Sequence, residues 1–179
     1  MPAPHWLSEL ERIDAALYAA VADADVPPLD RAMHRLSVAA NYSRLWIGIA
    51  GLLALAGGRD GRRAAFDGLA SIAVTSAIVN VAFKPLGRRR RPERGPILAR
   101  HVRMPRSRSF PSGHAASAFA FAAGVAGTQP QLGLPLRALA ALVAYSRVHT
   151  GVHFPGDVVV GALAGTAIAV VARPGQPTP

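Results

Sequence analysis

The segment SRVHTGVHFPGD, residues 146–157, places an arginine, two histidines and an aspartate within one short stretch. His153 and Asp157 are four residues apart, so they approach each other if a helix begins near Phe154. The carboxylate of Asp157 could then accept the Nδ1–H of His153, fixing the tautomer and leaving Nε2 bare. For this pair alone, an ordinary contact at a helix end is the alternative. We expect His149, one turn earlier, to support the structure.

A second polar cluster is SFPSGHAASAF, residues 109–119. Pro111 suits the first turn of a helix, and Ser112, Gly113 and His114 follow it. Free backbone N–H groups at a helix N-terminus bind anions, and Gly113 lets the backbone come close to a ligand. An ordinary capped helix start is the alternative.

The third cluster, KPLGRRRRP, spans residues 84–92. It opens a loop, residues 84–110, with ten basic residues, one acid and several prolines that prevent one regular helix. Such a loop suits a membrane boundary. Taken alone, the run indicates a solvated stripe beside a membrane, or a site for nucleic acid or anionic headgroups.

Composition narrows the chemistry of these clusters. The chain is 51% hydrophobic with a mean hydropathy of +0.25, which is high for a soluble domain. It has no cysteine, so disulfides, thiolate metal sites and a cysteine nucleophile are excluded. Nine of the ten acidic residues lie at or before Glu93, and Asp157 is the only one beyond it. A two-metal hydrolase needs several carboxylates, so we expect chemistry without a metal or another cofactor.

The apolar runs predict an all-α integral membrane bundle of about five spans. These are residues 45–58, closed by Arg59, Arg62 and Arg63, then 64–83, 115–136 with a turn at Gln129-Pro130, 138–145 and 158–172. Several are short for a bilayer core, which needs about 20 helical residues. A soluble all-α bundle with an alanine-rich core is the alternative.

The N-terminal region, residues 1–40, has a different pattern. Residues 5–22 carry apolar side chains at three- and four-residue spacing, which predicts an amphipathic helix. Pro27-Pro28 should end it, and residues 29–40 should form a second short helix. Both are expected on the membrane surface or against the bundle. We therefore divide the chain into residues 1–40, a membrane domain at 41–172, and a Pro-rich disordered tail at 173–179.

In an up-and-down bundle the three clusters fall on one side of the membrane. A transferring phosphoryl group needs cations around its oxygens, an in-line nucleophile and a proton donor for the leaving oxygen. Lys84, Arg91 and Arg147 offer the charge, and His114 and His153 offer the chemistry. Together the clusters predict a site for a phosphate ester.

The same residues carry a family resemblance. The family patterns K-x6-R-P, P-S-G-H and S-R-x5-H-x3-D are complete here, in order, at residues 84–92, 111–114 and 146–157. Over residues 41–172 the chain resembles the type 2 phosphatidic acid phosphatase superfamily of membrane lipid phosphatases, which also includes vanadium haloperoxidases and bacterial acid phosphatases. It is also similar to short actinobacterial members, including those acting on polyprenyl-linked sugar phosphates in cell-wall synthesis.

The resemblance implies a role for each motif residue. His153 attacks phosphorus and becomes a phosphohistidine, and Asp157 holds and polarises it. His114 protonates the leaving alkoxide and then activates water. The phosphoryl oxygens are cradled by Lys84, Arg91, Ser112, Gly113 and Arg147. The family works without a metal.

We therefore expect a lipid phosphatase that acts on a lipid-linked phosphate monoester or diphosphate, such as decaprenylphosphoryl phosphoribose. Phosphatidate, phosphatidylglycerol phosphate and undecaprenyl diphosphate are alternative substrates. A vanadate-dependent peroxidase is disfavoured because those proteins are larger and soluble. A membrane protein that only binds anionic lipid explains the arginines but gives His114 and His153 no role.

The expected partners are the lipid substrate and membrane lipids, with no nucleic acid, and the sequence leaves the oligomeric state open. Location is expected to be the cytoplasmic membrane, with several spans. With a cytoplasmic N-terminus, twelve Lys and Arg residues lie on the side of the clusters once Lys84 and Arg91 are set aside, against five on the other. The positive-inside rule then predicts a site facing the cytoplasm.

Overall fold

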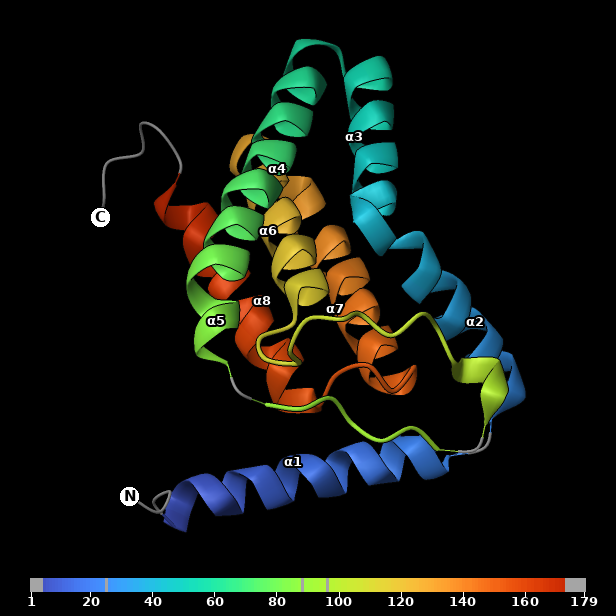
Figure 1. Ribbon diagram of the computed structural model, residues 1–179. Helices are drawn as coiled ribbons and strands as arrows, with labels where there is room; N and C mark the ends of the chain where they lie inside the picture. Colours follow the sequence, from blue (N-terminus) through green and yellow to red (C-terminus); the bar gives the residue numbers. More distant parts are fainter. Residues whose placement is uncertain (1–4, 25, 88, 96, 173–179) are drawn as a thin grey trace.

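A bundle of helices makes up the computed structural model, which describes residues 5–24, 26–87, 89–95 and 97–172. The helices are α1 (His5–Asp23), α2 (Pro27–Ala39), α3 (Arg44–Ala56), α4 (Gly58–Ile78), α5 (Lys84–Leu86), α6 (Gly113–Thr128), α7 (Gly133–His149) and α8 (Pro155–Val171). Short turns add η1 (Asn41–Ser43), η2 (Val79–Phe83), η3 (Leu98–Arg100) and η4 (Pro130–Leu132). The described ranges hold no strand, so the all-α prediction is confirmed (Figure 1). The expected tail at 173–179 lies outside the described residues.

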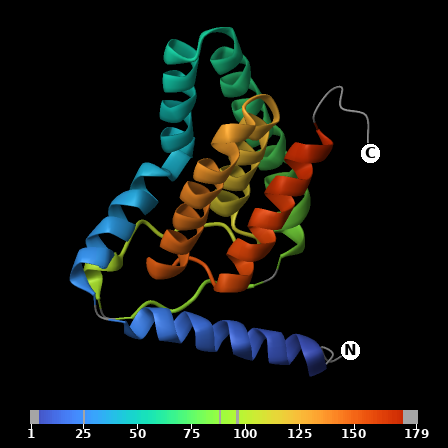
Figure 2. The ribbon, with the colours of Figure 1, turned by 180° about the vertical axis from the view of Figure 1, so that it is seen from behind.

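Helix α6 is the centre of the bundle and packs against α4, α7 and α8 (Figures 1 and 2). Its sequence is mostly alanine and glycine, and it buries side chains on every face. A helix that is apolar all round is expected to be enclosed in this way. The ring of Phe121 packs against that of Trp46 on α3, with centroids 5.2 Å apart.

Glycines set how closely the helices approach α6. A Cβ on Gly124 would lie 2.6 Å from the backbone oxygen of Asp67 and 2.9 Å from the Cα of Gly68 on α4. On the other side, Gly165 of α8 lies directly against the backbone of Ala116. Small residues allow such backbone contacts between helices in membranes.

Only part of the span prediction is supported by helix length and hydropathy. Among the described residues, one helix is long and apolar enough to cross a membrane, Gly58–Phe83, with 26 residues. Helices α2 and α3 pass the same test as a pair, but they are bent by 66°. Helices α6, α7 and α8 have 16, 17 and 17 residues, below the roughly 20 that cross a bilayer core unaided. The count of five spans stays a prediction.

Three predicted boundaries are wrong. The second long helix does not start at Ala64 but at Gly58, whose φ of +58° forms the turn after α3. Its first turns hold the arginines expected between spans, since arginine is a good helix former. Pro27 and Pro28 do not only end the preceding helix but also begin α2, because proline fits the first helical position. Residues 115–136 do turn near Pro130 as predicted, but the expected break between residues 136 and 138 lies inside α7, which is continuous from Gly133 to His149.

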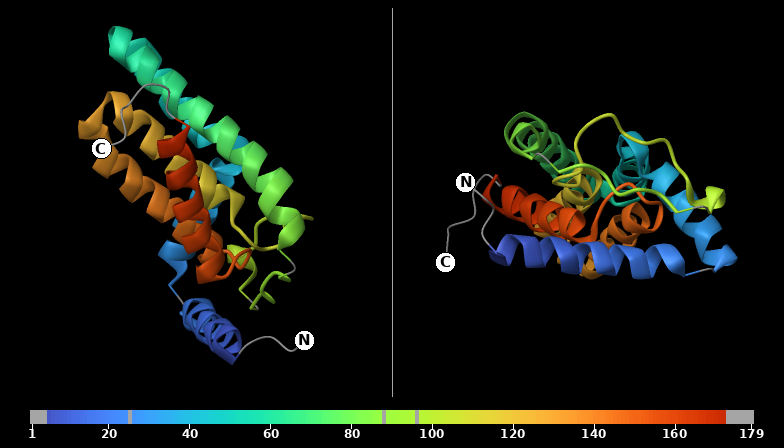
Figure 3. Two further views of the ribbon diagram at one scale, coloured as in Figure 1. Left: turned by 90° about the vertical axis from the view of Figure 1, so that its left-hand side faces the viewer. Right: turned by 60° about the horizontal axis from the view of Figure 1, so that its bottom comes forward.

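The two N-terminal helices differ in their surroundings. Helix α1 lies crosswise at one end of the bundle (Figures 1 and 3), and its apolar residues Trp6, Leu10, Ile13 and Leu17 are exposed. Helix α2 packs against α7 and buries Met33 and Ser37. The chain bends between α2 and α3 because two non-glycine residues of η1 adopt left-handed φ angles of 55° and 58°.

We expect Gly124→Ala to lower the stability of the protein by about 1–3 kcal/mol, the usual cost of overpacking. The added methyl group meets backbone atoms of α4, which cannot move without separating the helices. The matched control is Gly48→Ala on α3, where a Cβ meets nothing within 4 Å. Thermal unfolding of both variants in one detergent measures the difference. Equal melting temperatures would contradict the packing account.

Candidate active site

The three polar clusters meet at one end of the bundle, the end that α1 crosses. The backbone N–H of Ser112, before α6, donates to the carbonyl of Asp157 on α8 at 3.0 Å. A guanidinium nitrogen of Arg91 lies 3.2 Å from Nε2 of His153. A Cβ on Gly113 would be 4.0 Å from the Cε of Lys84. These contacts join all three clusters into one site.

His153 lies between a cation and a carboxylate. Its Nδ1 is 3.4 Å from Oδ2 of Asp157, and its Nε2 faces Arg91. Because a guanidinium can only donate, Nε2 must accept and Nδ1 carries the proton. Arg91 also donates to the carbonyl of Val152 at 2.6 Å, which holds it beside the ring. The ring is thus fixed with a lone pair on Nε2, the arrangement of an oriented nucleophile or base.

Asp157 is fully buried and surrounded by donors. Its Oδ2 accepts from the hydroxyl of Ser109 at 2.5 Å and from the backbone N–H of Phe154 at 3.0 Å. Its Oδ1 accepts from Arg89 at 3.3 Å. A buried carboxylate is tolerated when it is hydrogen-bonded in this way.

Arg89 links Asp157 to the N-terminal helix. The same guanidinium nitrogen donates to Oδ2 of Asp14 on α1 at 2.5 Å, and the guanidinium stacks over the ring of Phe154 at 3.9 Å. The other oxygen of Asp14 accepts from the backbone N–H of Gly156 at 2.6 Å. Asp14 therefore holds in place both Arg89, which donates to Asp157, and the first turn of α8.

Lys84 and Arg91 converge on one oxygen atom. The ammonium of Lys84 and the guanidinium of Arg91 both donate to the hydroxyl of Ser107, at 2.8 and 3.3 Å. Arg91 also donates to the backbone carbonyl of Ser107 at 2.9 Å. The two cations are therefore close enough to bind oxygens of a single phosphoryl group. Burial lowers the pKa of both side chains; the nearby Arg91 lowers that of Lys84 further, and Arg94 lowers that of Arg91.

Arg147 is 1% exposed at the end of α7. One terminal nitrogen donates to the hydroxyl of Ser37 on α2 at 2.5 Å and to its carbonyl at 3.3 Å. Its buried Nε has no hydrogen-bond partner among the described residues. A buried donor left without a partner is costly, so this nitrogen is suited to an anion.

The start of α6 carries the remaining motif residues. The hydroxyl of Ser112 caps the helix by accepting from the N–H of Ala115 at 3.4 Å. His114 Nε2 is 3.1 Å from the side-chain oxygen of Asn41. Gly161 of α8 packs against this turn, since a Cβ there would be 2.5 Å from the carbonyl of Ser112.

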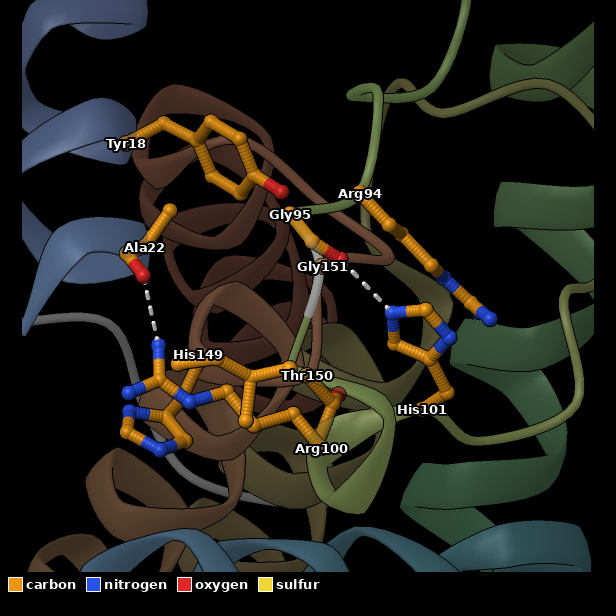
Figure 4. Close-up of a pocket in the computed structure, with 10 residues that line it drawn as sticks. Tyr18, Ala22, Arg94, Gly95, Arg100, His101, His149, Thr150 and Gly151 are labelled. Atoms are coloured by element: carbon orange, nitrogen blue, oxygen red, sulfur yellow. Dashed lines mark hydrogen bonds between the residues drawn. The ribbon is translucent and has the colours of Figure 1, made fainter. Parts of the chain in front are cut away.

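His149 lies outside the site that the three clusters form. Its Nε2 is 2.8 Å from Oδ1 of Asp30 on α2, which also accepts from Arg100 at 2.8 Å. Arg100 donates to the backbone oxygen of Ala22 at the end of α1 as well. Figure 4 shows His149 and Arg100 among the residues that line a cavity of about 20 Å³, which has room for about one water molecule. The cluster ties α1, α2 and the basic loop to α7.

Several residues of the site were missed from sequence. Ser107, Ser109, Asn41, Ser37, Arg89 and Asp14 all contact motif residues, directly or through one neighbour. Most of them lie far from their motif partners in the sequence, so no local residue spacing could predict these contacts. The only signal was that serines 107 and 109 stand among basic residues in the loop.

Burial lowers the pKa of His153 from its ordinary value of 6.5 to about 4, and nearby Arg91 acts in the same direction, whereas Asp157 raises it. We therefore expect His153 to stay neutral between about pH 8 and pH 5. Asp157→Asn should lower this pKa further, and Arg91→Gln should raise it. Nitrogen NMR of histidine-labelled protein in detergent measures both shifts. Wild-type His153 titrating near pH 6.5 would contradict the expectation.

The sequence and structure are similar to those of known proteins. The PAP2 superfamily model matches residues 65–178, a range that holds all three motifs. Decaprenylphosphoryl-5-phosphoribose phosphatase of Mycolicibacterium smegmatis is 35% identical over 158 residues, 87% of this chain and 84% of that protein. The protein of the same name from Mycobacterium tuberculosis is 41% identical over 93 residues. That match covers 52% of this chain, and it spans about half the length of the M. tuberculosis relative.

Two crystal structures share the fold. LpxE of Aquifex aeolicus has a TM-score of 0.67 and 27% identity, covering 88% of this chain and 92% of that one. A transmembrane PAP2 type phosphatidylglycerolphosphate phosphatase from Bacillus subtilis has a TM-score of 0.69 and 25% identity, covering 91% and 84%. The helical fold, the matched range and the three complete motifs agree, and the resemblance found in the sequence is confirmed. The chain belongs to the PAP2 superfamily.

Proposed function

We propose that the protein is a metal-independent membrane phosphatase that hydrolyses a lipid-linked phosphate ester through a phosphohistidine. The observation that carries the proposal is the fixed imidazole of His153. Its Nε2 accepts from Arg91, which shares the hydroxyl of Ser107 with Lys84, and its Nδ1 faces Asp157. Cations rather than carboxylates surround the phosphoryl position, which suits direct binding of phosphate oxygens.

In the first step, Nε2 of His153 attacks phosphorus and the bond from phosphorus to the ester oxygen breaks. His114 gives a proton to the leaving alkoxide. In the second step, His114 takes a proton from water, whose oxygen attacks phosphorus and breaks the phosphorus–nitrogen bond, releasing phosphate. Asp157 stabilises the positive charge on the ring of His153 in both steps. On binding, phosphoryl oxygens take over the donors that Arg91 and Lys84 give to Ser107.

Decaprenylphosphoryl phosphoribose is the substrate we favour, because the M. smegmatis relative named for it aligns with most of this chain. Phosphatidylglycerol phosphate is the second candidate, because the similar B. subtilis structure is named for that activity. Polyprenyl diphosphates and phosphatidate complete the panel to be tested.

Purified protein in detergent with EDTA should release phosphate from at least one lipid of this panel. His153→Ala should reduce the rate at least about 10³-fold, because removal of a nucleophile abolishes its covalent step. The matched control is His5→Ala, an exposed histidine on α1, which should keep full activity. Activity that requires a divalent metal, or that survives in His153→Ala, would refute the mechanism.

We also infer that the protein crosses the membrane several times, with the site on the cytoplasmic side. The excess of Lys and Arg at the end that holds the site supports this orientation. Because the chain has no cysteine, single cysteines report on each end. In intact cells an impermeant maleimide should label Arg137→Cys, at the far end, but not Arg103→Cys in the basic loop. The reverse pattern would place the site outside.

A further inference from the structure

A cavity of about 250 Å³ lies beside the phosphoryl site, on the side of His114. Lys84, Gly113 and His114 line it, whereas His153 is not among its described lining residues. In phosphoryl transfer the attacking and leaving atoms lie roughly in line on opposite sides of phosphorus. Because His114 lines the cavity and His153 does not, a leaving group that takes its proton from His114 would enter this cavity when His153 attacks.

The lining of this cavity is polar although the surrounding bundle is rich in alanine. Helix α4, the turn η2, helix α6 and the turn η1 contribute hydroxyl and amide groups, from Thr75, Ser76, Asn80, Ser117, Tyr42 and Ser43. The hydroxyls of Ser76 and Ser117 are 3.3 Å apart, a long hydrogen bond that a ligand can replace. The buried hydroxyl of Thr75 has no partner among the described residues. These groups are therefore suited to ligand hydroxyls.

The backbone beside the cavity is irregular. The turn η2 is a π-helix that runs from Val79 to Phe83, and the N–H of Lys84 bonds back to the carbonyl of Val79. Pro85 follows directly and cannot donate to a helical carbonyl, which disturbs the preceding turn. Single π-turns are frequent at functional sites. This one contains Asn80 and is followed directly by Lys84, and both residues line the cavity.

The size of the cavity limits what it can hold. Pockets for drug-sized ligands measure about 300–1,000 Å³, so a cavity of about 250 Å³ suits one small polar group rather than a prenyl chain. We propose that it is the subsite for a polyol leaving group, a sugar ring or glycerol. The polyol hydroxyls bind Ser76, Asn80 and Ser117, and its ester oxygen faces His114. This inference rests on the proposed phosphatase function.

The test compares kcat/KM for three substrates whose leaving groups differ. These are decaprenylphosphoryl phosphoribose, phosphatidylglycerol phosphate and dodecyl phosphate, whose leaving group has no further hydroxyl. Wild-type protein should prefer a polyol substrate over dodecyl phosphate. Which of the two polyol substrates has the higher kcat/KM shows whether the subsite favours a pentose or glycerol. Asn80→Leu combined with Ser117→Ala should reduce the preference over dodecyl phosphate about tenfold or more, the effect of losing one or two hydrogen bonds.

The matched control is Thr166→Val on α8. Its hydroxyl donates to the carbonyl of Ala162 on the same helix, and this variant should keep the wild-type preference. An equal loss for all three substrates, or a wild-type protein without preference, would overturn the subsite while leaving the phosphatase in place. Binding of the same compounds to His153→Ala protein, with and without the cavity substitutions, tests the subsite without turnover. One outcome is that the cavity substitutions weaken polyol binding to His153→Ala protein while wild-type protein hydrolyses no substrate. In that case the subsite is supported and the proposed reaction is refuted. Unchanged binding overturns the subsite.

Discussion

A carboxylate without any solvent exposure, that of Asp157, is the constraint on which the site depends. Removing a charge from water is unfavourable unless several donors replace the water. Asp157 finds them in Ser109, Arg89, His153 and the backbone N–H of Phe154. Because Ser109 and Arg89 belong to the basic loop, the loop must run back across the start of α8. The same path brings Arg91 to His153, so one buried charge organises both sides of the imidazole.

Close helix packing keeps this arrangement rigid. Gly161 allows the second turn of α8 to lie against the carbonyl of Ser112, and Ser112 donates its own N–H to the carbonyl of Asp157 in the first turn. The start of α6 and the start of α8 are therefore joined through backbone atoms. Side chains can change rotamer, whereas backbone contacts of this kind stay fixed. Electrostatic catalysis requires charged and polar groups that are held in place before the reaction.

The three motifs could be read from the sequence because each is a set of residue types at a fixed local spacing. The sequence also predicted the turn near Pro130, where proline marks the end of one helix and the start of the next. It failed at Gly58, because the run of arginines resembles an interhelical loop although arginine is a good helix former. Contacts such as Ser109–Asp157, Asn41–His114 and Ser37–Arg147 join residues 48, 73 and 110 positions apart. Only the packing of whole helices determines such pairs, so no periodicity could show them.

The contacts of Asp14 show that the segment of the chain that carries the motifs is shorter than the segment that fixes the geometry of the site. The family match begins at residue 65, and the division at residue 40 keeps every motif residue on one side. Yet the carboxylate of Asp14 holds Arg89 and the N–H of Gly156 from α1. A fragment that starts at residue 41 would carry the full set of motifs without this brace. The part of the chain that holds the charges of the site in place therefore includes a helix that crosses the end of the bundle and exposes apolar side chains.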